Sequence, residues 1–218
     1  MPVRPWFQGI AMDEALVFLD VDTQADFMLP SGSLCVPGAE EIVPNLERLM
    51  NHARLHGIPV ISSADAHPPD DPSFAQWPPH CVVGTPGQRR IPVTQFPAAK
   101  VVPNRRGAFV PPDAGWAGQT IVEKQEYDVS TNVNFPAILE SLGRRRWVVF
   151  GVATEYCVRS SALALRQRGF PVDLVIDAIK PITEEGGRKA LQELVAAGVR
   201  QVSTEMVCGA VRAVPSSQ

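Results

Sequence analysis

The chain contains six short, mostly apolar runs that have the length of β-strands. Several are continuous rather than alternating, which is typical of parallel strands buried on both faces of a sheet. The first of these runs ends in acidic residues at Asp20 and Asp22. The pattern predicts strands at residues 15–22, 58–63, 120–124, 147–150, 172–176 and 199–203.

Between these runs, apolar residues recur at the three- and four-residue spacing of amphipathic helices. Thr154 is expected to cap one of these helices, with Glu155 in its first turn. Helices are predicted at residues 39–56, 132–142, 155–168 and 184–197. Because strand and helix alternate, the fold class is α/β: a single domain with a mostly parallel six-stranded sheet and helices on both faces, in a Rossmann-like three-layer arrangement.

The domain is expected to span residues 15–208, after an irregular N-terminal arm at 1–14 and before a short tail at 209–218. Residues 64–119 show no periodicity and are rich in Pro, Gly and Trp. Such a long stretch in a compact domain is more often functional than filler. Its second part, 88–119, is predicted to be a loop insertion that packs over the pocket rim or against a neighbouring subunit. The alternative is a plain surface excursion.

The charge, the length of the apolar runs and the cysteines limit the functions that the chain is expected to have. The net charge is -3, which gives no support to binding of nucleic acid or an anionic membrane surface. No apolar run has the length that spans a bilayer, and residues 1–14 contain no signal-peptide core. The four cysteines are far apart and form no CxxC pair, so a reduced, cytoplasmic protein is expected: Cys35, Cys81, Cys157 and Cys208.

Cys157 lies where a predicted strand gives way to a predicted helix. The first N–H groups of a helix have no partner within it, and their dipoles favour an anion. A thiol at this position is therefore expected to be pushed toward the thiolate, and the same N–H groups could hold an oxyanion. The position suits a cysteine nucleophile. The alternative is a cysteine that only packs in the core, as most buried cysteines do.

Other polar residues are expected at the same edge of the sheet. Asp22 ends the first strand, Lys124 ends the third, and Asp65 follows the second. In parallel sheets, ligands bind beyond the carboxyl ends of the strands. A carboxylate that accepts a proton and an ammonium that stabilises a thiolate both suit a cysteine nucleophile. Taken alone, Asp22 could be a turn residue and Lys124 a solvated charge.

A metal site is a second hypothesis for this edge. Asp65 and His67 are two residues apart, so in extended chain they point to one side. His80 could complete a set of two histidines and one carboxylate. Three protein ligands leave open positions for water or substrate, as in catalytic metal sites.

Taken together, the motifs resemble those of the isochorismatase-like cysteine hydrolases, and among these the nicotinamidase (pyrazinamidase) branch. The resemblance runs from about residue 15 to about 208. The motifs follow the order of the family: Asp22-Thr23-Gln24-Ala25-Asp26-Phe27, Gly32-Ser33-Leu34, Asp65-Ala66-His67, Trp77-Pro78-Pro79-His80-Cys81, Gly84-Thr85-Pro86-Gly87, Lys124 and Gly151-Val152-Ala153-Thr154-Glu155-Tyr156-Cys157-Val158.

The resemblance implies roles for individual residues. It implies a bound divalent metal ion, with zinc as the first choice and iron or manganese as alternatives. It also implies a cis peptide between Val152 and Ala153. The implied sets are a catalytic triad of Asp22, Lys124 and Cys157, metal ligands Asp65, His67 and His80, oxyanion-hole N–H groups of Ala153 and Cys157, and ring-binding residues Phe27, Trp77 and Tyr156.

Two departures from the family pattern bear on these roles. Many relatives have a further histidine four residues beyond the one matching His67, where this chain has Asp71. The ligand or water shell of the metal is therefore expected to differ. The stretch between His80 and Lys124 is also longer than usual, which affects substrate access and contacts in a homo-oligomer.

The function hypothesis is a metal-dependent cysteine amidohydrolase that converts nicotinamide, and pyrazinamide as well, to the acid and ammonia in NAD salvage. One alternative is a related cysteine amidase for another small amide. The other is a catalytically silent α/β binding protein with a structural metal. Neither nucleic acid nor a membrane is expected as a partner, and homo-oligomer formation is left open.

Overall fold

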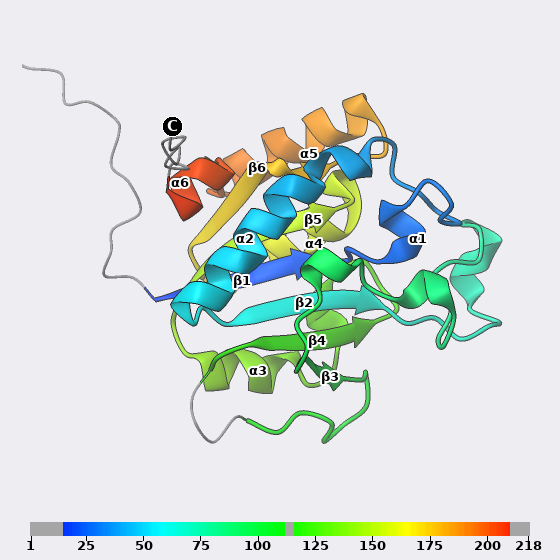
Figure 1. Ribbon diagram of the computed structural model, residues 1–218, viewed down its shortest axis with the longest axis horizontal. Helices are drawn as coiled ribbons and strands as arrows, with labels where there is room; N and C mark the ends of the chain where they lie inside the picture. The colour runs from blue at the N-terminus through cyan, green and yellow to red at the C-terminus, as the bar shows by residue number, and fades with distance from the viewer. Residues whose placement is uncertain (1–14, 112–115, 210–218) are drawn as a thin grey trace, which may run out of the picture.

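The computed structural model describes residues 15–111 and 116–209, which form one α/β domain around a seven-stranded sheet (Figure 1). The strands lie in the order β3-β4-β2-β1-β5-β6-β7, and every neighbouring pair is parallel. Their bounds are β1 Leu16–Val21, β2 Val60–Asp65, β3 Lys100–Val102, β4 Gln119–Lys124, β5 Arg146–Val152, β6 Val172–Lys180 and β7 Arg200–Val202. The predicted parallel sheet is confirmed, with one more strand than expected.

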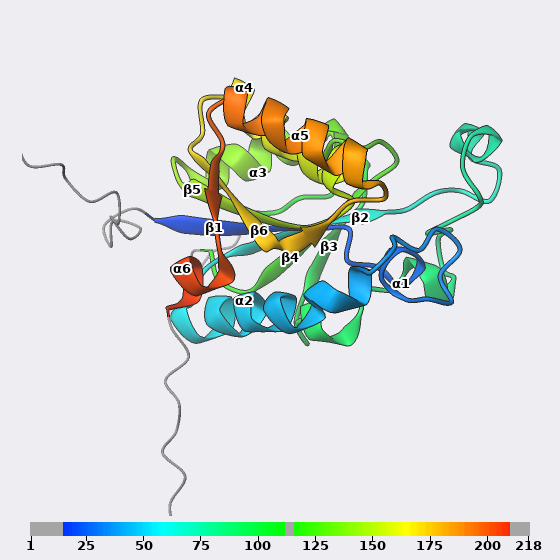
Figure 2. The ribbon, with the colours of Figure 1, turned by 90° about the horizontal axis from the view of Figure 1, so that it is seen from above.

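Helices cover both faces of the sheet, as predicted. Figure 2 shows α3, α4 and α5 on one face and α2 and α6 on the other. The bounds are α1 Ala25–Met28, α2 Val43–His56, α3 Phe135–Leu142, α4 Arg159–Gln167, α5 Glu184–Ala196 and α6 Thr204–Cys208. Among the described residues, no helix is both long and apolar enough to cross a membrane.

Strand β1 explains why the apolar runs are continuous. Val17 and Leu19 pack into the core beneath α3 and α4, whereas Phe18 packs into the core beneath α2. All three side chains are fully buried. A central strand covered on both faces needs apolar residues at successive positions, and this requirement produces the unbroken run in the sequence.

The sheet differs from the prediction at β3, β5 and β6, the last of which continues past residue 176 to Lys180. The edge strand β3 was not predicted, because it has only three residues within the Pro-rich stretch. Strand β5 continues through Gly151 to Val152 and does not end at the glycine. Gly151 has φ 116°, and a Cβ there would lie 2.1 Å from the carbonyl oxygen of Val21. Glycine is required here because β5 approaches β1 closely.

The segment 88–119 begins beside the residues that follow β1, where the N–H groups of Ala25 and Ile91 pair with the carbonyl oxygens of Arg89 and Thr23, and it then runs along the sheet. Phe96 is buried with the guanidinium of Arg54 above its ring, and Trp116 donates a hydrogen bond to Ser141. None of its described residues lines the pocket around Cys157. Residues 112–115 lie outside the described part of the chain, and packing over the pocket rim or against another subunit stays a prediction. The expected arm 1–14 and, apart from Gly209, the expected tail lie outside the described residues.

Candidate active site

The strand order places four predicted residues at one edge of the sheet. From β1 the chain proceeds outward to β2 and β4, then returns to place β5 on the other side of β1. This reversal is the switch point at which α/β sheets bind ligands. Asp22 follows β1, Asp65 ends β2, Lys124 ends β4 and Cys157 follows β5.

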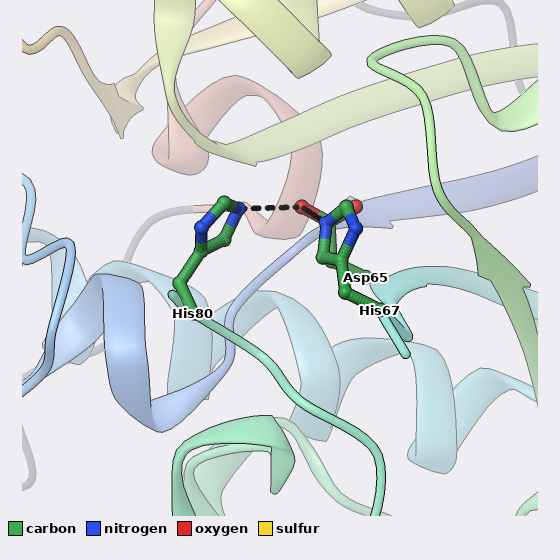
Figure 3. Close-up of side chains that lie close together, drawn as sticks. All are labelled: Asp65, His67 and His80. Atoms are coloured by element: carbon green, nitrogen blue, oxygen red, sulfur yellow. Dashed lines mark ion pairs between the residues drawn. The ribbon is translucent and has the colours of Figure 1, made fainter. Parts of the chain in front are cut away.

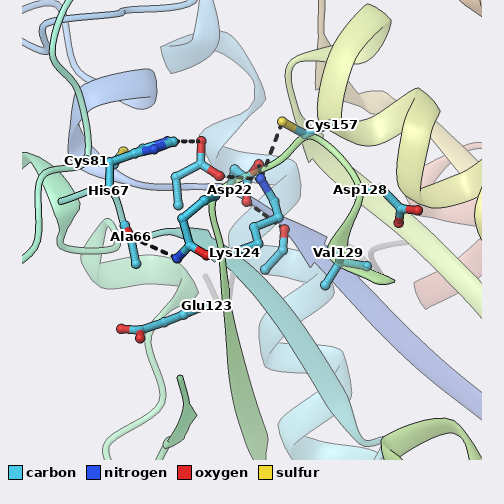
Figure 4. A network of polar contacts seen from close by, with 12 residues as sticks. Asp22, Ala66, His67, Cys81, Glu123, Lys124, Asp128, Val129 and Cys157 are labelled. Carbon is cyan, nitrogen blue, oxygen red and sulfur yellow. Dashed lines mark hydrogen bonds and ion pairs between the residues drawn. The ribbon is translucent and has the colours of Figure 1, made fainter. Parts of the chain in front are cut away.

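Lys124 is the centre of this cluster, and its side chain is completely buried. Its Nζ lies 2.8 Å from Asp22 Oδ2 and 3.6 Å from Cys157 Sγ, and it also forms an ion pair with Asp65 (Figure 4). Asp22 is fully buried and Cys157 is 7% exposed. The structure thus brings together a carboxylate, an ammonium and a thiol, as the sequence predicted, and it adds the Asp65 carboxylate to the group.

The electrostatics of the cluster correct one expectation. Burial raises the pKa of the Cys157 thiol well above its usual value, although Lys124 opposes this effect. Burial also raises the pKa of Asp22, again against Lys124. Burial alone would lower the pKa of Lys124, but Asp22 and Asp65 outweigh it and raise the pKa well above its usual range. The pKa shift of Cys157 is thus opposite in direction to the one expected from the helix dipole, and the neighbouring Asp22 carboxylate is placed to accept the thiol proton.

Two residues that the sequence did not single out hold the carboxylates in place. Ser63 donates a hydrogen bond to Asp22 Oδ1 at 2.6 Å. The Gln24 amide accepts a hydrogen bond from the Asp65 N–H at 2.7 Å and donates one to the Asp65 carbonyl oxygen at 2.8 Å. Gln24 belongs to the motif that begins at Asp22, which was the available signal; the Ser63 contact depends on strand pairing that the sequence does not show.

Cys157 lies in a π-helical turn, Thr154–Val158, that leads into α4. The peptide between Val152 and Ala153 is cis, which confirms the expectation from the family resemblance. Ala153, and not Thr154, occupies the N-cap position, and its carbonyl oxygen accepts hydrogen bonds from the N–H groups of Tyr156 and Val158. The prediction of Thr154 as the cap is therefore wrong. Its Oγ1 is buried without a hydrogen-bond partner.

Asp65, His67 and His80 are close enough to hold one metal ion. One candidate ligand atom from each residue lies within 4.8 Å of the others, and all three residues are buried. The two Nε2 atoms lie 3.6 Å (His67) and 3.8 Å (His80) from Asp65 Oδ2 (Figure 3). His67 Nε2 is buried without a hydrogen-bond partner, which suits a metal ligand. Two imidazoles and one carboxylate suit zinc, iron or manganese.

Both histidines are oriented by a contact at Nδ1. His80 Nδ1 lies 2.7 Å from the carbonyl oxygen of Pro78, and His67 Nδ1 lies 2.9 Å from Asp71 Oδ2. Burial would raise the pKa of Asp71, but hydrogen bonds from Ser73 and His67 outweigh it and lower the pKa to about 2. Asp71, the departure from the family pattern, is therefore a carboxylate at neutral pH that contacts a candidate ligand.

A narrow pocket of about 40 Å³ lies between the thiol and the candidate metal ligands. Phe27, Trp77 and Tyr156 contribute to its wall, as predicted. Tyr127, which was not predicted, also lines it, and its hydroxyl accepts a hydrogen bond from Trp77 Nε1 at 3.0 Å. The volume is close to that of one water molecule, so binding of a ring requires movement of these aromatic side chains.

Comparison with known proteins agrees with this geometry. A nicotinamidase of Acinetobacter baylyi is 28% identical over 208 residues, covering 86% of this chain and 92% of the relative. A nicotinamidase/pyrazinamidase of Mycobacterium tuberculosis is 29% identical over 198 residues, covering 86% and 96%. The crystal structure of a pyrazinamidase of Pyrococcus horikoshii in complex with zinc superposes with a TM-score of 0.73 at 30% identity, covering 87% of this chain and 99% of the other.

The family model supplies the remaining comparison. The model described as the isochorismatase domain matches residues 14–206, which include every candidate site residue. The expected amide hydrolase agrees with the activities named for these relatives. The family resemblance inferred from the motifs is thereby confirmed, and the chain belongs to the isochorismatase domain family.

Proposed function

We propose that the chain is a metal-dependent cysteine amidohydrolase that converts nicotinamide and water to nicotinate and ammonia through a thioester on Cys157. The observation that carries the proposal is the buried contact of Lys124 with both Asp22 and Cys157, at the base of a pocket with aromatic walls. The relatives named as nicotinamidases support the substrate.

In the first half-reaction, Asp22 accepts the Cys157 proton while the sulfur attacks the amide carbon. The raised pKa of Asp22 makes this carboxylate a stronger base, while the raised pKa of Cys157 favours proton transfer that accompanies attack over prior ionisation of the thiol. Lys124 stays protonated between the two carboxylates and offsets the negative charge that moves onto sulfur. No free thiolate has to form before substrate binds.

The tetrahedral oxyanion is assigned to the backbone N–H groups of Ala153 and Cys157, which belong to residues lining the pocket. When it collapses, the C–N bond breaks and Asp22 returns the proton to nitrogen, so that ammonia leaves. A water molecule then attacks the thioester carbon and gives a proton to Asp22. The C–S bond breaks, nicotinate is released and the thiol recovers its proton.

A divalent ion held by Asp65, His67 and His80 would supply a Lewis acid that binds the ring nitrogen and aligns the carbonyl with the thiol. Asp65 serves both groups, since one of its oxygens contacts Lys124 and the other faces the two histidines. Phe27, Trp77 and Tyr156 are assigned to the faces and edge of the ring.

The pocket favours an uncharged aromatic amide over the rival amide substrates. No Lys or Arg is among its described lining residues, so an amide that carries a carboxylate would find no side-chain cation there. Most of the lining is aromatic or aliphatic, which suits a flat ring, and it includes Phe27, Leu34, Trp77, Tyr127 and Tyr156.

The test is a hydrolysis assay with purified, zinc-loaded protein. Nicotinamide should yield ammonia and nicotinate in equal amounts, and pyrazinamide should also be hydrolysed. A panel of aliphatic amides, with and without a carboxylate, should react at a kcat/KM at least about 100-fold lower, a difference of about 2.7 kcal/mol in transition-state binding. A better aliphatic substrate would favour the rival amidase, and no ammonia from any amide would favour the silent binding protein.

A further inference from the structure

Asp71 uses its two carboxylate oxygens for two different partners. Oδ1 accepts a hydrogen bond from the Ser73 N–H at 2.9 Å and thereby caps the 3₁₀ turn Pro72–Ala75. Oδ2 lies 2.9 Å from His67 Nδ1. The His67 side chain is 3% exposed and that of Asp71 is 9% exposed, so water is largely excluded from this contact.

The contact determines which imidazole nitrogen of His67 carries the proton. An ionised carboxylate only accepts hydrogen bonds, so Nδ1 must be the donor. In a neutral imidazole the lone pair is then on Nε2, the nitrogen that faces Asp65. A metal ligand needs that lone pair, and a carboxylate behind the ring also makes the ligand more basic.

We propose that Asp71 is a positioning residue that fixes the metal-binding tautomer of His67, in place of a further ligand of its own. This inference rests on the metal site of the proposed function. Asp71 is not among the residues whose ligand atoms converge, which are Asp65, His67 and His80. Both of its oxygens are already engaged, so it acts on the metal through His67.

The candidate metal site is open to solvent, so metal binding can be measured on the folded protein. A cleft of about 450 Å³ is lined by Asp71 together with all three candidate ligands and Gln125. Metal ions can therefore equilibrate with the folded protein, and affinity can be measured at equilibrium.

Two substitutions at Asp71 separate the tautomer role from the capping role. In Asp71→Asn, the oxygen can still accept from Ser73, since Asn is as good a cap as Asp, but the amide nitrogen then donates to His67 Nδ1. That contact moves the His67 proton to Nε2 and blocks the lone pair. In Asp71→Ala the cap is lost, but neither tautomer is imposed.

The matched control is Asp128→Asn. Asp128 caps the 3₁₀ turn Val129–Thr131 by the same bond, with its Oδ1 accepting from the Ser130 N–H at 2.8 Å. The substitution and the capping geometry are the same as at Asp71, but the hydrogen bonds of Asp128 are to Ser130 and Thr131 and not to a histidine.

The measurement is the dissociation constant for Zn²⁺, obtained by competition with a chromophoric chelator. Asp71→Asn should weaken binding about 100-fold and Asp71→Ala about 10-fold, within the range for such outer contacts. Asp128→Asn should leave it unchanged. If Asp71 serves only as a cap, Asp71→Ala will weaken Zn²⁺ binding more than Asp71→Asn does. That result, or wild-type affinity in Asp71→Asn, overturns the proposal.

A second measurement does not depend on metal. In the metal-free proteins, at a pH high enough to keep His67 neutral, its ¹⁵N chemical shifts should show the proton on Nδ1 in wild type and on Nε2 in Asp71→Asn. The same tautomer in both proteins overturns the proposal. If wild type shows no affinity for Zn²⁺, the metal in the proposed function fails, while these shifts still decide the role of Asp71.

Discussion

At the scale of single residues, the cluster holds two carboxylates and one ammonium. Asp22 and Asp65 both contact Lys124, and all three side chains are nearly inaccessible to water. Removing one member of a buried ion pair leaves an uncompensated charge and lowers the free energy of unfolding by several kcal/mol. The arrangement therefore keeps Lys124 protonated and leaves Asp22 as the group that exchanges a proton with Cys157.

Asp22→Asn tests that assignment. The amide has nearly the same shape but cannot accept the thiol proton, so kcat/KM for nicotinamide should fall about 10²–10⁴-fold. Ser63→Ala, which removes only the 2.6 Å hydrogen bond to Asp22, is the milder comparison and should cost less activity. Retention of activity within a factor of three in Asp22→Asn would exclude Asp22 as the base.

Among the helices and strands, the sequence predicted those that are long enough to show a periodic pattern of apolar residues. Six strands and the longer helices follow from apolar runs and helical spacing. The strand β3 and the helix α1 were missed because three or four residues are too few for a period to appear. The π-helical turn at Cys157 was also missed, because one extra residue per turn leaves little trace in the apolar pattern.

The candidate site was predictable at the ends of strands and less so between them. Asp22, Lys124 and Cys157 each follow an apolar run, so chain order alone places them at one edge. The Asp71–His67 and Ser63–Asp22 contacts depend on loop geometry and strand pairing. The raised pKa of the Cys157 thiol depends on burial, which the local dipole argument did not include.

Glu155 joins the π-helical turn to the segment before α5. Its carboxylate accepts hydrogen bonds from the N–H groups of Ile182 and Thr183, at 3.1 and 2.9 Å. In Glu155→Gln, the NH₂ group of the amide would face the N–H donors of Ile182 and Thr183. The π-helical turn that holds Cys157 should therefore shift, and kcat should fall about tenfold. Glu193→Gln, which alters an exposed pair with Arg159, should not change kcat. Equal kcat values for both variants would show that the Glu155 contacts do not position Cys157.

Arg90 attaches the loop before β3 to β1. Its guanidinium, 3% exposed, forms an ion pair with the buried Asp20 and donates to the Ser63 carbonyl oxygen at 2.9 Å. Arg90→Met leaves Asp20 without a cation, so the free energy of unfolding should fall by about 3–5 kcal/mol near neutral pH. Arg54→Met, at an exposed site, should change it by less than about 1 kcal/mol.

The stability deficit of Arg90→Met, which is the loss in free energy of unfolding relative to wild type, should depend on pH. Burial raises the pKa of Asp20 in the folded protein, and loss of Arg90 raises it further. The folded state then binds a proton more tightly than the unfolded chain, so stability is gained as pH falls through the folded pKa. Urea unfolding at a series of pH values should show the deficit shrinking in acid; a deficit that grows would contradict the assignment.

At the scale of the whole molecule, the core and the candidate metal ligands are largely separate. The sheet is buried between two layers of helices, whereas His67 and His80 lie in the loop after β2. The fold therefore does not depend on the ion for its core. This differs from small zinc domains, in which metal binding supplies the folding free energy.

Chelation should consequently abolish activity without unfolding the protein. Nicotinamide hydrolysis should fall at least about 100-fold, since the proposed metal ion would align the substrate with the thiol. Far-ultraviolet circular dichroism and a cooperative thermal transition should persist, and added Zn²⁺ should restore activity. Unfolding on chelation, or full activity without metal, would contradict a catalytic metal.

Cys157 is the proposed nucleophile, and nicotinamide hydrolysis by Cys157→Ala beside wild type tests this role directly. The substitution removes one small group at the start of a helix, so the variant should fold normally, as circular dichroism and thermal unfolding would verify. Its kcat should fall at least about 10⁴-fold, as when other hydrolases lose their nucleophile. Near-normal release of ammonia by the folded variant would contradict the account.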